Sequence, residues 1–364
     1  MNIPIQNVYY LFVYAWARFS GGTVANVGVQ ESPDIPNLFA KLLATGLRQL
    51  LRRGLDRGYS SFTDELIAPR GRLRLDRMLK EASHVRGRAI CDYDELTHDV
   101  LHNQIIKATL RNLTRCVQVT KDLKHELMSL DRRLYDVQDR PLSASIFRNV
   151  MLSRNNREYR FLLRLCEFVF WALMPDEASG SARFQNVLED ETRMSSVFQD
   201  FLRNFFQMHC AQYRVRSEAL GWDVSDATEA DLAFLPRMLT DVTLRKADHT
   251  IIMDAKFYRN TLARSPYGRR VHSQHLYQLM AYLQHEKVRN RNKGLSGMLI
   301  YPDVGRSLRL RYRLLGIPVL VCTVDLSRQW QEIEFELHEL LAACSVATQF
   351  PNTSLTSFCD EAAT

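Results

Sequence analysis

Residues 238–258 read MLTDVTLRKADHTIIMDAKFY and are the most informative part of the sequence. Residues 240–244 and 251–257 are mostly β-branched or apolar, whereas residues 245–249 between them are mostly polar. Such a pattern predicts two β-strands joined by a turn.

The pairing of these strands determines which side chains meet. If the turn centres on Ala247 and Asp248, Asp241 lies opposite Asp254, with their Cβ atoms about 5 Å apart. The turn contains no Asn-Gly or Asp-Gly pair, so a slip of one residue would place Asp241 on the other face.

A lysine shares the face of the two carboxylates. Side chains alternate along a strand, so Lys256 projects from the same side as Asp254. The other side carries three residues that we expect in the core: Met253, Ala255 and Phe257. Two neighbouring carboxylates repel each other, and a hard divalent cation with oxygen ligands, typically Mg²⁺, relieves that repulsion. With a lysine to orient water and offset charge, the pattern indicates metal-dependent phosphodiester cleavage; the alternative is a hairpin with ordinary surface charges.

Helices are predicted on both sides of the hairpin. Before it, apolar residues from Met194 to Phe206 recur at helical spacing, which predicts a packed core helix. After it, we expect a helix over residues 271–287 with three polar residues spaced four apart: Gln274, Gln278 and Tyr282. A side-chain amide donates and accepts hydrogen bonds, so this stripe would bind phosphate or position the carboxylates; the alternative is a polar helix flank.

An acidic residue on one strand, Asp-Ala-Lys on the next and a helix with Gln-x-x-x-Tyr together resemble the PD-(D/E)xK nuclease core in its RecB-like form. A closer likeness is to McrC, the nuclease subunit family of the McrBC modification-dependent restriction systems. Four runs in the second half of the chain carry it: residues 235–244, 252–258, 272–283 and 297–302. Shorter matches extend it over nearly the whole chain: residues 5–10, 14–16, 69–72, 103–107 and 321–324.

The resemblance implies a role for each matching residue. Its metal ligands would be Asp241, Asp254 and the backbone carbonyl of Ala255. Lys256 and Gln278 would join the two aspartates as catalytic residues. Three further residues would support the DNA or the active site: Gln274, Tyr282 and Gln199.

Gln199 is a departure from the family pattern. Many nucleases of this superfamily have a glutamate at this point of the helix that precedes the hairpin. A neutral amide binds a cation more weakly, which leaves open how many ions bind. The adjacent Asp200 would compensate if the helix register differs.

A composition shift between Pro175 and Glu191 predicts two domains. We expect an α/β (α+β) protein: residues 1–180 form a mixed α+β partner-binding domain, and residues 181–364 form a PD-(D/E)xK restriction-endonuclease-like domain. Within the first domain, helical spacing of leucines and isoleucines predicts helices over residues 38–51 and 101–113.

A protruding arm with one basic face is predicted near residues 65–76, where Arg70, Arg72 and Arg74 alternate with Gly71, Leu73 and Leu75. Its face would contact phosphates or an acidic protein groove, or be solvated; the resemblance to McrC favours contact with a partner AAA+ ring. Arg264, in an expected loop over residues 259–270, is a second candidate for contact with the ring or with the DNA backbone.

Composition narrows the class of protein. The formal charge of +7 and the pI near 9.0 favour a polyanionic partner, though only weakly. Seven scattered cysteines without a C-x-x-C pair indicate reduced thiols in an intracellular, cytoplasmic protein rather than disulfides or a zinc site. No secretory signal is expected, because the apolar residues 8–19 lack a basic leader and a small-residue cleavage site. No membrane span is expected either, because the apolar run over residues 161–174 is short and contains charges.

We therefore expect an Mg²⁺-dependent endonuclease subunit of an McrBC-like complex. By the resemblance, it would cut modified, methylcytosine-containing double-stranded DNA and stimulate a hexameric McrB-like AAA+ GTPase. The chain has no G-x-x-x-x-G-K-[ST] phosphate loop, so a partner must supply the GTP hydrolysis. Two alternatives remain: a non-catalytic adaptor that activates the GTPase ring, and a stand-alone RecB-like exonuclease.

Overall fold

The computed structural model describes residues 3–16, 34–152, 157–175, 182–184, 187–258, 262–265, 268–290, 293–303 and 307–346. The chain divides into two compact units. One comprises residues 1–18 and 187–364 and is called the sheet unit; the other comprises residues 19–186 and is called the arm unit. The predicted division placed all of residues 1–180 in one domain, so its assignment of the first eighteen residues is wrong.

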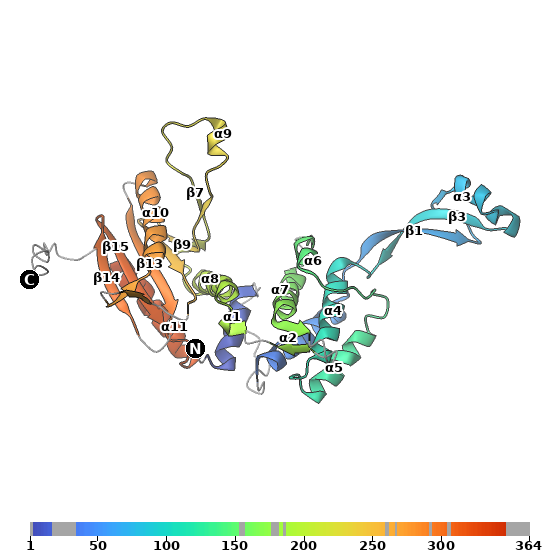
Figure 1. The fold of residues 1–364 in the computed structure, drawn as a ribbon, viewed down its shortest axis with the longest axis horizontal. Coiled ribbons are helices and arrows are strands. Elements are labelled where there is room, and N and C mark those ends of the chain that lie inside the picture. The colour runs from blue at the N-terminus through green and yellow to red at the C-terminus, as the bar shows by residue number, and fades with distance from the viewer. Residues whose placement is uncertain are drawn as a thin grey trace, which may run out of the picture. The chain divides into compact units, whose positions relative to one another are not determined.

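The sheet unit is built on a mixed sheet whose six described strands run in the order β14-β15-β13-β10-β9-β6. Strands β10, β13 and β15 are parallel, whereas β9 and β14 each run antiparallel to their neighbours. The bounds are β6 Arg214–Arg216, β9 Val242–Arg245, β10 His249–Ala255, β13 Gly294–Pro302, β14 Arg309–Leu314 and β15 Ile317–Val324. The predicted α/β fold class is confirmed (Figure 1).

Helices cover both faces of this sheet, and its central strands are buried on both sides. Every residue of β10 and β15 is buried. Gly297 of β13 faces Leu279 and Leu283 of α10 (Ser273–Arg289), whereas the neighbouring Ser296 donates a hydrogen bond to Cys344 of α11 (Trp330–Val346). Thus α10 lies on one face and α11 on the other.

The helix predicted before the hairpin is α8 (Glu191–His209), and its apolar stripe is buried as expected. Helix α1 (Ile5–Trp16) packs along α8 in the sheet unit. The side chain of Asn7 donates hydrogen bonds to the carbonyls of Leu326 and Arg328, 2.8 and 2.7 Å away. A stacked contact between Tyr10 and Trp330 adds to this attachment. These contacts explain why residues 1–18 belong with the C-terminal part of the chain.

Two hairpins leave the edges of the sheet unit. Strands β7 (Ala219–Leu220) and β8 (Met238–Leu239) flank an excursion that includes α9 (Glu229–Leu232). Strands β11 (Leu262–Ser265) and β12 (Gly268–Val271) pair antiparallel, so the expected loop over residues 259–270 is wrong for these stretches. The side chain of Arg264 lies outside the described residues.

The arm unit combines a group of helices with a long β-hairpin. Its helices are α2 Ile35–Arg53, α4 Leu101–Arg115, α5 Lys121–Arg132, α6 Ala144–Arg148 and α7 Arg157–Ala172, and the short strands β4 Leu173–Pro175 and β5 Ala182–Phe184 pair beside them.

No helix among the described residues is long and apolar enough to cross a membrane. The described cysteines are buried thiols without a disulfide, and Cys359 lies outside the described residues.

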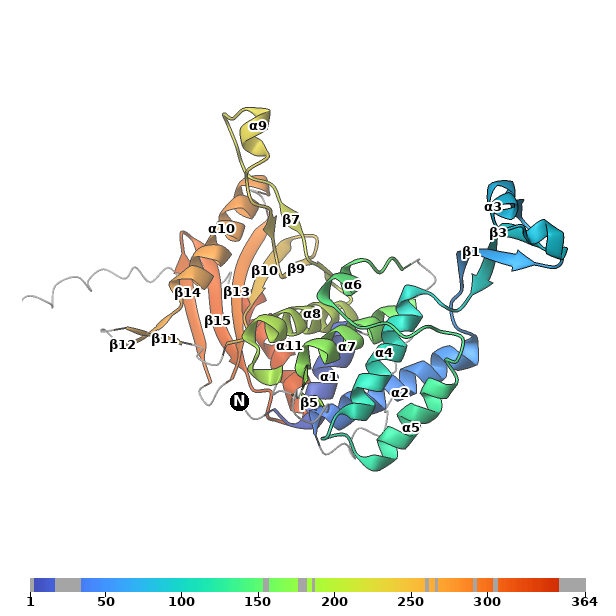
Figure 2. The same ribbon diagram turned by 45° about the vertical axis from the view of Figure 1, so that its right-hand side comes forward.

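The arm itself is formed by β1 (Gly58–Leu66) and β3 (Ala89–Thr97), which pair antiparallel along nine residues and extend away from the helices of this unit (Figure 2). Its tip contains β2 (Arg72–Leu73), α3 (Leu75–Lys80) and the 3₁₀ turn η2 (Ser83–Arg86). An arm was predicted here, and the structure contains one.

The predicted basic face of the arm is wrong, because acidic residues of β3 and α3 pair with the arginines. Arg74 pairs with Asp92 and with Asp76, and Arg72 lies opposite Asp92 in the strand ladder. Arg70 lies 3.3 Å from Glu95 and 3.6 Å from the centre of the Tyr93 ring. Residues 58–97 contain seven Lys or Arg and seven Asp or Glu, so the arm has no formal net charge.

Gly71 makes the turn at the arm tip possible. Its φ is +70°, and a Cβ there would lie 2.2 Å from the carbonyl oxygen of Asp92. Gly87 has nearly the same φ, +69°, but nothing within 4 Å of its Cβ position. Both positions penalise an L-residue by about 1–2 kcal/mol, but only the first adds a backbone clash.

We predict that Gly71→Ala opens the tip of the arm, whereas Gly87→Ala largely preserves it. Limited proteolysis and amide hydrogen exchange over residues 66–90 measure this difference, with circular dichroism as the control for the rest of the chain. Equal protection of the arm in the two variants would show that the close approach to Asp92 is unimportant.

Candidate active site

The hairpin of β9 and β10 has the predicted register. Arg245 pairs with Thr250 and Val242 with Met253, so the next opposed pair beyond the ladder is Asp241 and Asp254. The two carboxylates therefore meet at the end of β10, where it lies parallel to β13. A slip of one residue, which the turn sequence left open, does not occur.

Asp254 and Lys256 form the centre of the site. The Asp254 side chain is fully buried, and the Lys256 side chain is 12% exposed. Nζ of Lys256 lies 3.2 Å from Oδ1 and 3.1 Å from Oδ2 of Asp254. It also donates a hydrogen bond of 3.0 Å to Oε1 of Gln278 on α10, whose amide nitrogen donates in turn to the hydroxyl of Tyr282, 2.7 Å away.

Asp241 is held by backbone groups. Its Oδ2 accepts a hydrogen bond of 2.9 Å from the backbone N–H of Ala255. Arg203 of α8 donates to the Asp241 backbone carbonyl at 3.3 Å. The strand end and α8 together fix this carboxylate next to Asp254.

Burial makes the two carboxylates costly to ionise together. Burial and the negative charge of Asp241 together raise the pKa of Asp254 to about 7, against an opposing effect of Lys256. Burial also raises the pKa of Asp241, which Lys256 and the Ala255 N–H oppose. The pair therefore retains a proton near neutral pH when only the side chains of the protein are present.

Gln199 faces the site from α8. Its amide nitrogen donates a hydrogen bond of 3.2 Å to the carbonyl of Ala255, the backbone group that the resemblance assigns to the metal. Asp200 does not replace a glutamate here, because it forms an ion pair with Arg203 on the same helix. The face of β10 opposite Asp254 is apolar as expected, since Phe257 packs against Phe198 of α8.

Only two of the three polar residues predicted on α10 reach the site. Gln278 and Tyr282 join the hydrogen-bonded chain that leads to Asp254, whereas Gln274 is exposed and lies outside that chain. The other predicted contacts, Arg70, Arg72 and Arg74, belong to the arm unit.

An aromatic group beside the site was not predicted. His275 of α10 is buried, and its Nδ1 lies 2.9 Å from the hydroxyl of Tyr301 on β13. Its ring also contacts the rings of Tyr258 and His272. Burial and the positive charge of Lys256 together lower the pKa of His275 to about 4, so this imidazole is neutral at pH 7. The only signal in the sequence was the position of both histidines in the run 272–283 quoted above.

The donor set fits a hard divalent cation. Although Nζ of Lys256 is close, no described group makes a well-directed hydrogen bond to the buried Oδ2 of Asp254. Two carboxylates and a backbone carbonyl provide only oxygen ligands, which Mg²⁺ prefers. When both carboxylates are ionised, the single ammonium group leaves a local excess of negative charge, which a bound cation would offset in place of the retained proton.

The six-stranded mixed sheet with paired carboxylates and a lysine at the end of a central strand defines an α/β protein with a nuclease-like fold. A family model described as McrBC 5-methylcytosine restriction system component matches residues 9–302. The chain belongs to this family, as its sequence motifs predicted.

Two relatives illustrate the extent of the similarity. The chain is 31% identical over 338 residues to the type IV methyl-directed restriction enzyme EcoKMcrBC of Escherichia coli strain K12, covering 93% of this chain and 97% of that protein. Its fold resembles a chain in the refined half-complex from the tetradecameric assembly of Thermococcus gammatolerans McrB AAA+ hexamers with bound McrC. That match has a TM-score of 0.50 and 16% identity, and covers 93% of this chain and 76% of the other.

Proton binding by Asp254 predicts a distinctive pH dependence of stability. Because the folded-state pKa is raised, the contribution of this residue is fully present below its unfolded pKa of about 3.9 and is lost as the pH rises through the folded-state value near neutrality. We predict that, in chelator, the unfolding free energy of the wild type falls relative to that of Asp254→Asn between pH 4 and pH 8. The slope is at most about 1.4 kcal/mol per pH unit for one proton.

Urea unfolding at a series of pH values measures the difference between the two proteins. Added Mg²⁺ should reduce the loss of unfolding free energy at high pH in the wild type and should have little effect on the unfolding free energy of Asp254→Asn. A difference that does not change with pH would contradict the assignment of the proton to this pair.

Proposed function

We propose that this protein is the Mg²⁺-dependent DNA endonuclease subunit of an McrBC-type restriction complex in the cytoplasm. The observation that carries the proposal is the group formed at the end of β10 by the buried Asp254 with the half-buried Asp241 and Lys256. The E. coli relative is named a methyl-directed restriction enzyme, which supports modified, methylcytosine-containing DNA as the substrate.

Each side chain of the site would have a distinct role in this reaction. Asp241, Asp254 and the carbonyl of Ala255 would hold Mg²⁺, which when bound polarises a phosphoryl oxygen and lowers the pKa of water. The ammonium of Lys256 has three N–H groups; Asp254 and Gln278 engage two, and the third can donate to the attacking water or to a phosphate oxygen. Gln278, held by Tyr282, fixes the direction of that ammonium group.

The reaction expected at this site is hydrolysis. A water oxygen would form a bond to the phosphorus and give up one of its protons, while the bond from phosphorus to the leaving sugar oxygen breaks. The leaving sugar oxygen would take up a proton. The positive charge of Lys256 would favour the transition state, in which negative charge increases on the phosphoryl oxygens.

A second part of the proposal concerns the partner. We infer that the chain engages and stimulates a hexameric McrB-like AAA+ GTPase, because the T. gammatolerans assembly contains McrB hexamers with bound McrC. The arm is the best candidate for the contact. At its tip, Leu75 and Leu79 lie one turn apart on α3 with 63% and 70% of their surface exposed, and Val85 is 77% exposed.

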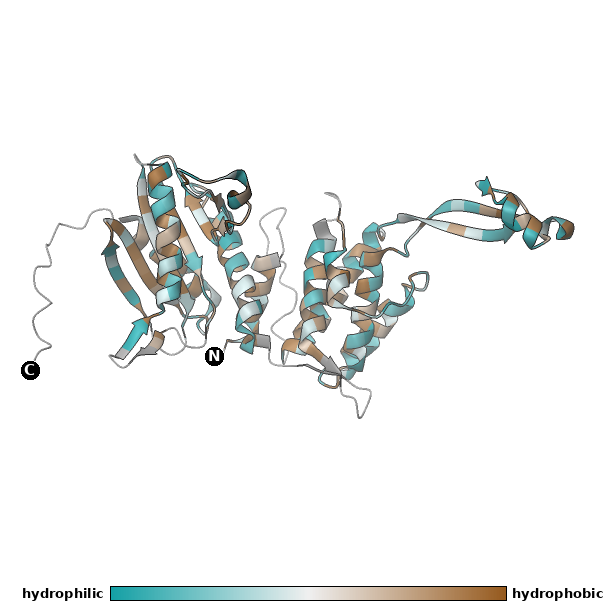
Figure 3. Ribbon diagram, turned by 45° about the horizontal axis from the view of Figure 1, so that its top comes forward, coloured by the Kyte–Doolittle hydropathy of each residue, from teal (hydrophilic) through white to brown (hydrophobic). Residues whose placement is uncertain are grey.

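Exposed apolar side chains on a projecting element are typical of a protein interface. The arm has equal numbers of acidic and basic residues, so electrostatic attraction to DNA phosphates is not favoured there. Figure 3 shows hydrophobic segments among hydrophilic ones at this tip. This distribution supports a protein partner for the arm, with the paired arginines near its tip contributing polar contacts at the margin.

We predict that Asp254→Ala in the assembled complex lowers cleavage of modified DNA by at least about 100-fold, because it removes a metal ligand. The GTP turnover of the partner ring should be unchanged. The matched control is Asp223→Ala, which removes an exposed carboxylate of the same unit and should cleave like the wild type.

The two alternatives give different results in the same assays. An adaptor without catalytic activity would leave cleavage by Asp254→Ala at the wild-type rate, with another protein making the cut. A stand-alone exonuclease would degrade free DNA ends processively as an isolated chain with Mg²⁺. Either result would overturn the proposed function.

We predict that the double substitution Leu75→Glu and Leu79→Glu abolishes stimulation of the partner GTPase, because it places two charges in the proposed apolar contact. Phe234→Glu is the control, since Phe234 is 89% exposed but belongs to the sheet unit. Steady-state GTP hydrolysis, with co-elution of the two proteins, measures the effect. Stimulation that persists in the arm variant would exclude this part of the arm from the interface.

A further inference from the structure

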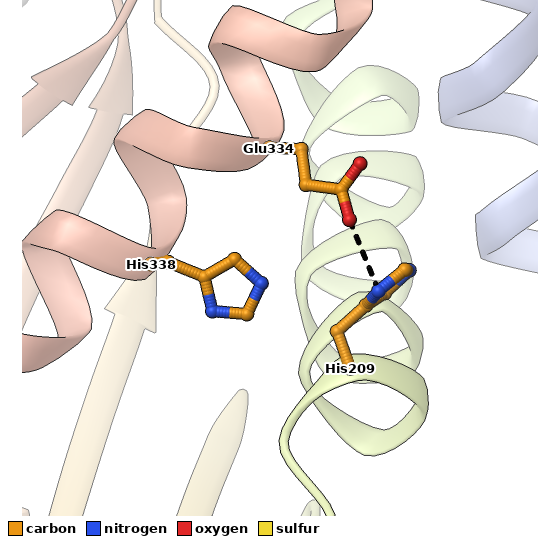
Figure 4. A group of neighbouring side chains, drawn as sticks. All are labelled: His209, Glu334 and His338. Carbon is orange, nitrogen blue, oxygen red and sulfur yellow. Dashed lines mark ion pairs between the residues drawn. The ribbon is translucent and has the colours of Figure 1, made fainter.

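A second group of ligand-type side chains lies where α8 meets α11, separate from the aspartates. His209 is the last residue of α8, and Glu334 and His338 lie four residues apart on α11. One potential ligand atom of each lies within 4.8 Å of the other two. Figure 4 shows the three side chains converging from the two helices.

Each histidine has one nitrogen towards this centre and the other held by a second group. Nδ1 of His209 lies 3.1 Å from Oε1 of Glu334, and its Nε2 lies 2.9 Å from the hydroxyl of Tyr14 on α1. Nδ1 of His338 lies 3.9 Å from the thiol of Cys210, and its other nitrogen is turned towards His209 and Glu334 (Figure 4). Metal-binding histidines are oriented in this way, through the nitrogen that does not bind the ion.

The protonation states suit ligands. Burial lowers the pKa of His209, against an opposing effect of Glu334, so its imidazole is neutral at pH 7. Burial raises the pKa of Tyr14 to about 12, so its hydroxyl keeps its proton and can either donate to Nε2 or accept from it. This freedom allows Nδ1 to lose its hydrogen while Nε2 gains one. Burial also raises the pKa of Cys210, which keeps this group a thiol beside His338.

We propose that His209, Glu334 and His338 bind a zinc ion. Two imidazoles and a carboxylate suit Zn²⁺, whose bonds to nitrogen and oxygen are about 2.0–2.2 Å long. In a tetrahedral site, ligand atoms are then about 3.4 Å apart. The pair His209 and Glu334 is already near that separation, and His338 needs to approach by no more than about 1.4 Å.

This site has a structural task that the nuclease centre does not share. It would join the end of α8 to α11. Through Tyr14 it would also join α1, which is far from these helices in sequence but belongs to the same unit. No step of the proposed cleavage depends on it. The alternative is that Glu334 and His209 simply form a hydrogen bond between two helices.

The test uses the full chain, stripped of metal with a chelator and titrated with ZnCl₂. We expect one tightly bound zinc per chain, measured by elemental analysis after desalting and by calorimetry. Asp254→Ala should bind zinc as the wild type does, which separates this site from the nuclease centre. Co²⁺ in place of zinc should give the visible absorption of a four-coordinate site.

Two variants identify the ligands. Glu334→Gln keeps the size of the side chain and His338→Ala removes a ring, and each should weaken zinc binding at least tenfold. His285→Ala, a partly buried histidine elsewhere in the unit, should not. Circular dichroism without zinc verifies that each variant is folded, and zinc should raise the melting temperature of the wild type but not that of Glu334→Gln.

Two results would overturn the proposal. One is a wild-type chain that retains no stoichiometric zinc. The other is that the Glu334→Gln and His338→Ala variants both fold and each bind zinc as tightly as the wild type. The ion would then lie elsewhere.

Discussion

The buried carboxylate of Asp254 is the constraint on which the candidate site depends. A charge at a fully buried position is costly unless neighbouring groups compensate it. Lys256 provides one positive charge on the same face of the strand, and Gln278 holds it from α10. Asp241 then adds a second negative charge, which an ordinary ion pair would not require. The arrangement is stable at neutral pH with a retained proton or with a bound cation, and this choice links the stability of the fold to its proposed chemistry.

Much of this site could be predicted because it depends on local pattern. Strand residues alternate between faces, so placing two strands and a turn was enough to bring Asp241 opposite Asp254 and Lys256 beside it. Helical periodicity likewise located α8 and α10, and with α10 the pair Gln278 and Tyr282. The restriction-system family followed from motifs that these same elements carry. Each of these inferences needed only neighbours in sequence or a single pairing.

The remaining features depend on contacts between distant parts of the chain. Nothing in the pattern of α1 indicates that Asn7 will bind carbonyls more than 300 residues away, so its place in the sheet unit was missed. The arginines of the arm alternate as expected, but Asp92 and Glu95, which pair with Arg74 and Arg70, are on β3, and only the strand pairing shows this. The same is true of His209, whose partners Glu334 and His338 are on another helix. A histidine has no ligand signature until its neighbours in space are known.

The two proposed ion sites differ in ligand chemistry, and this difference would keep their metals apart. Zinc binds most nitrogen and oxygen ligands more tightly than magnesium does, so affinity alone would not protect the nuclease centre. The aspartate site has only oxygen ligands, with the Lys256 ammonium beside them, which favours an ion that keeps part of its water shell. The histidine site has two imidazoles that are held by Tyr14 and Cys210, which favours zinc. A scarce zinc ion would therefore occupy the structural position first and leave the carboxylates to the abundant magnesium.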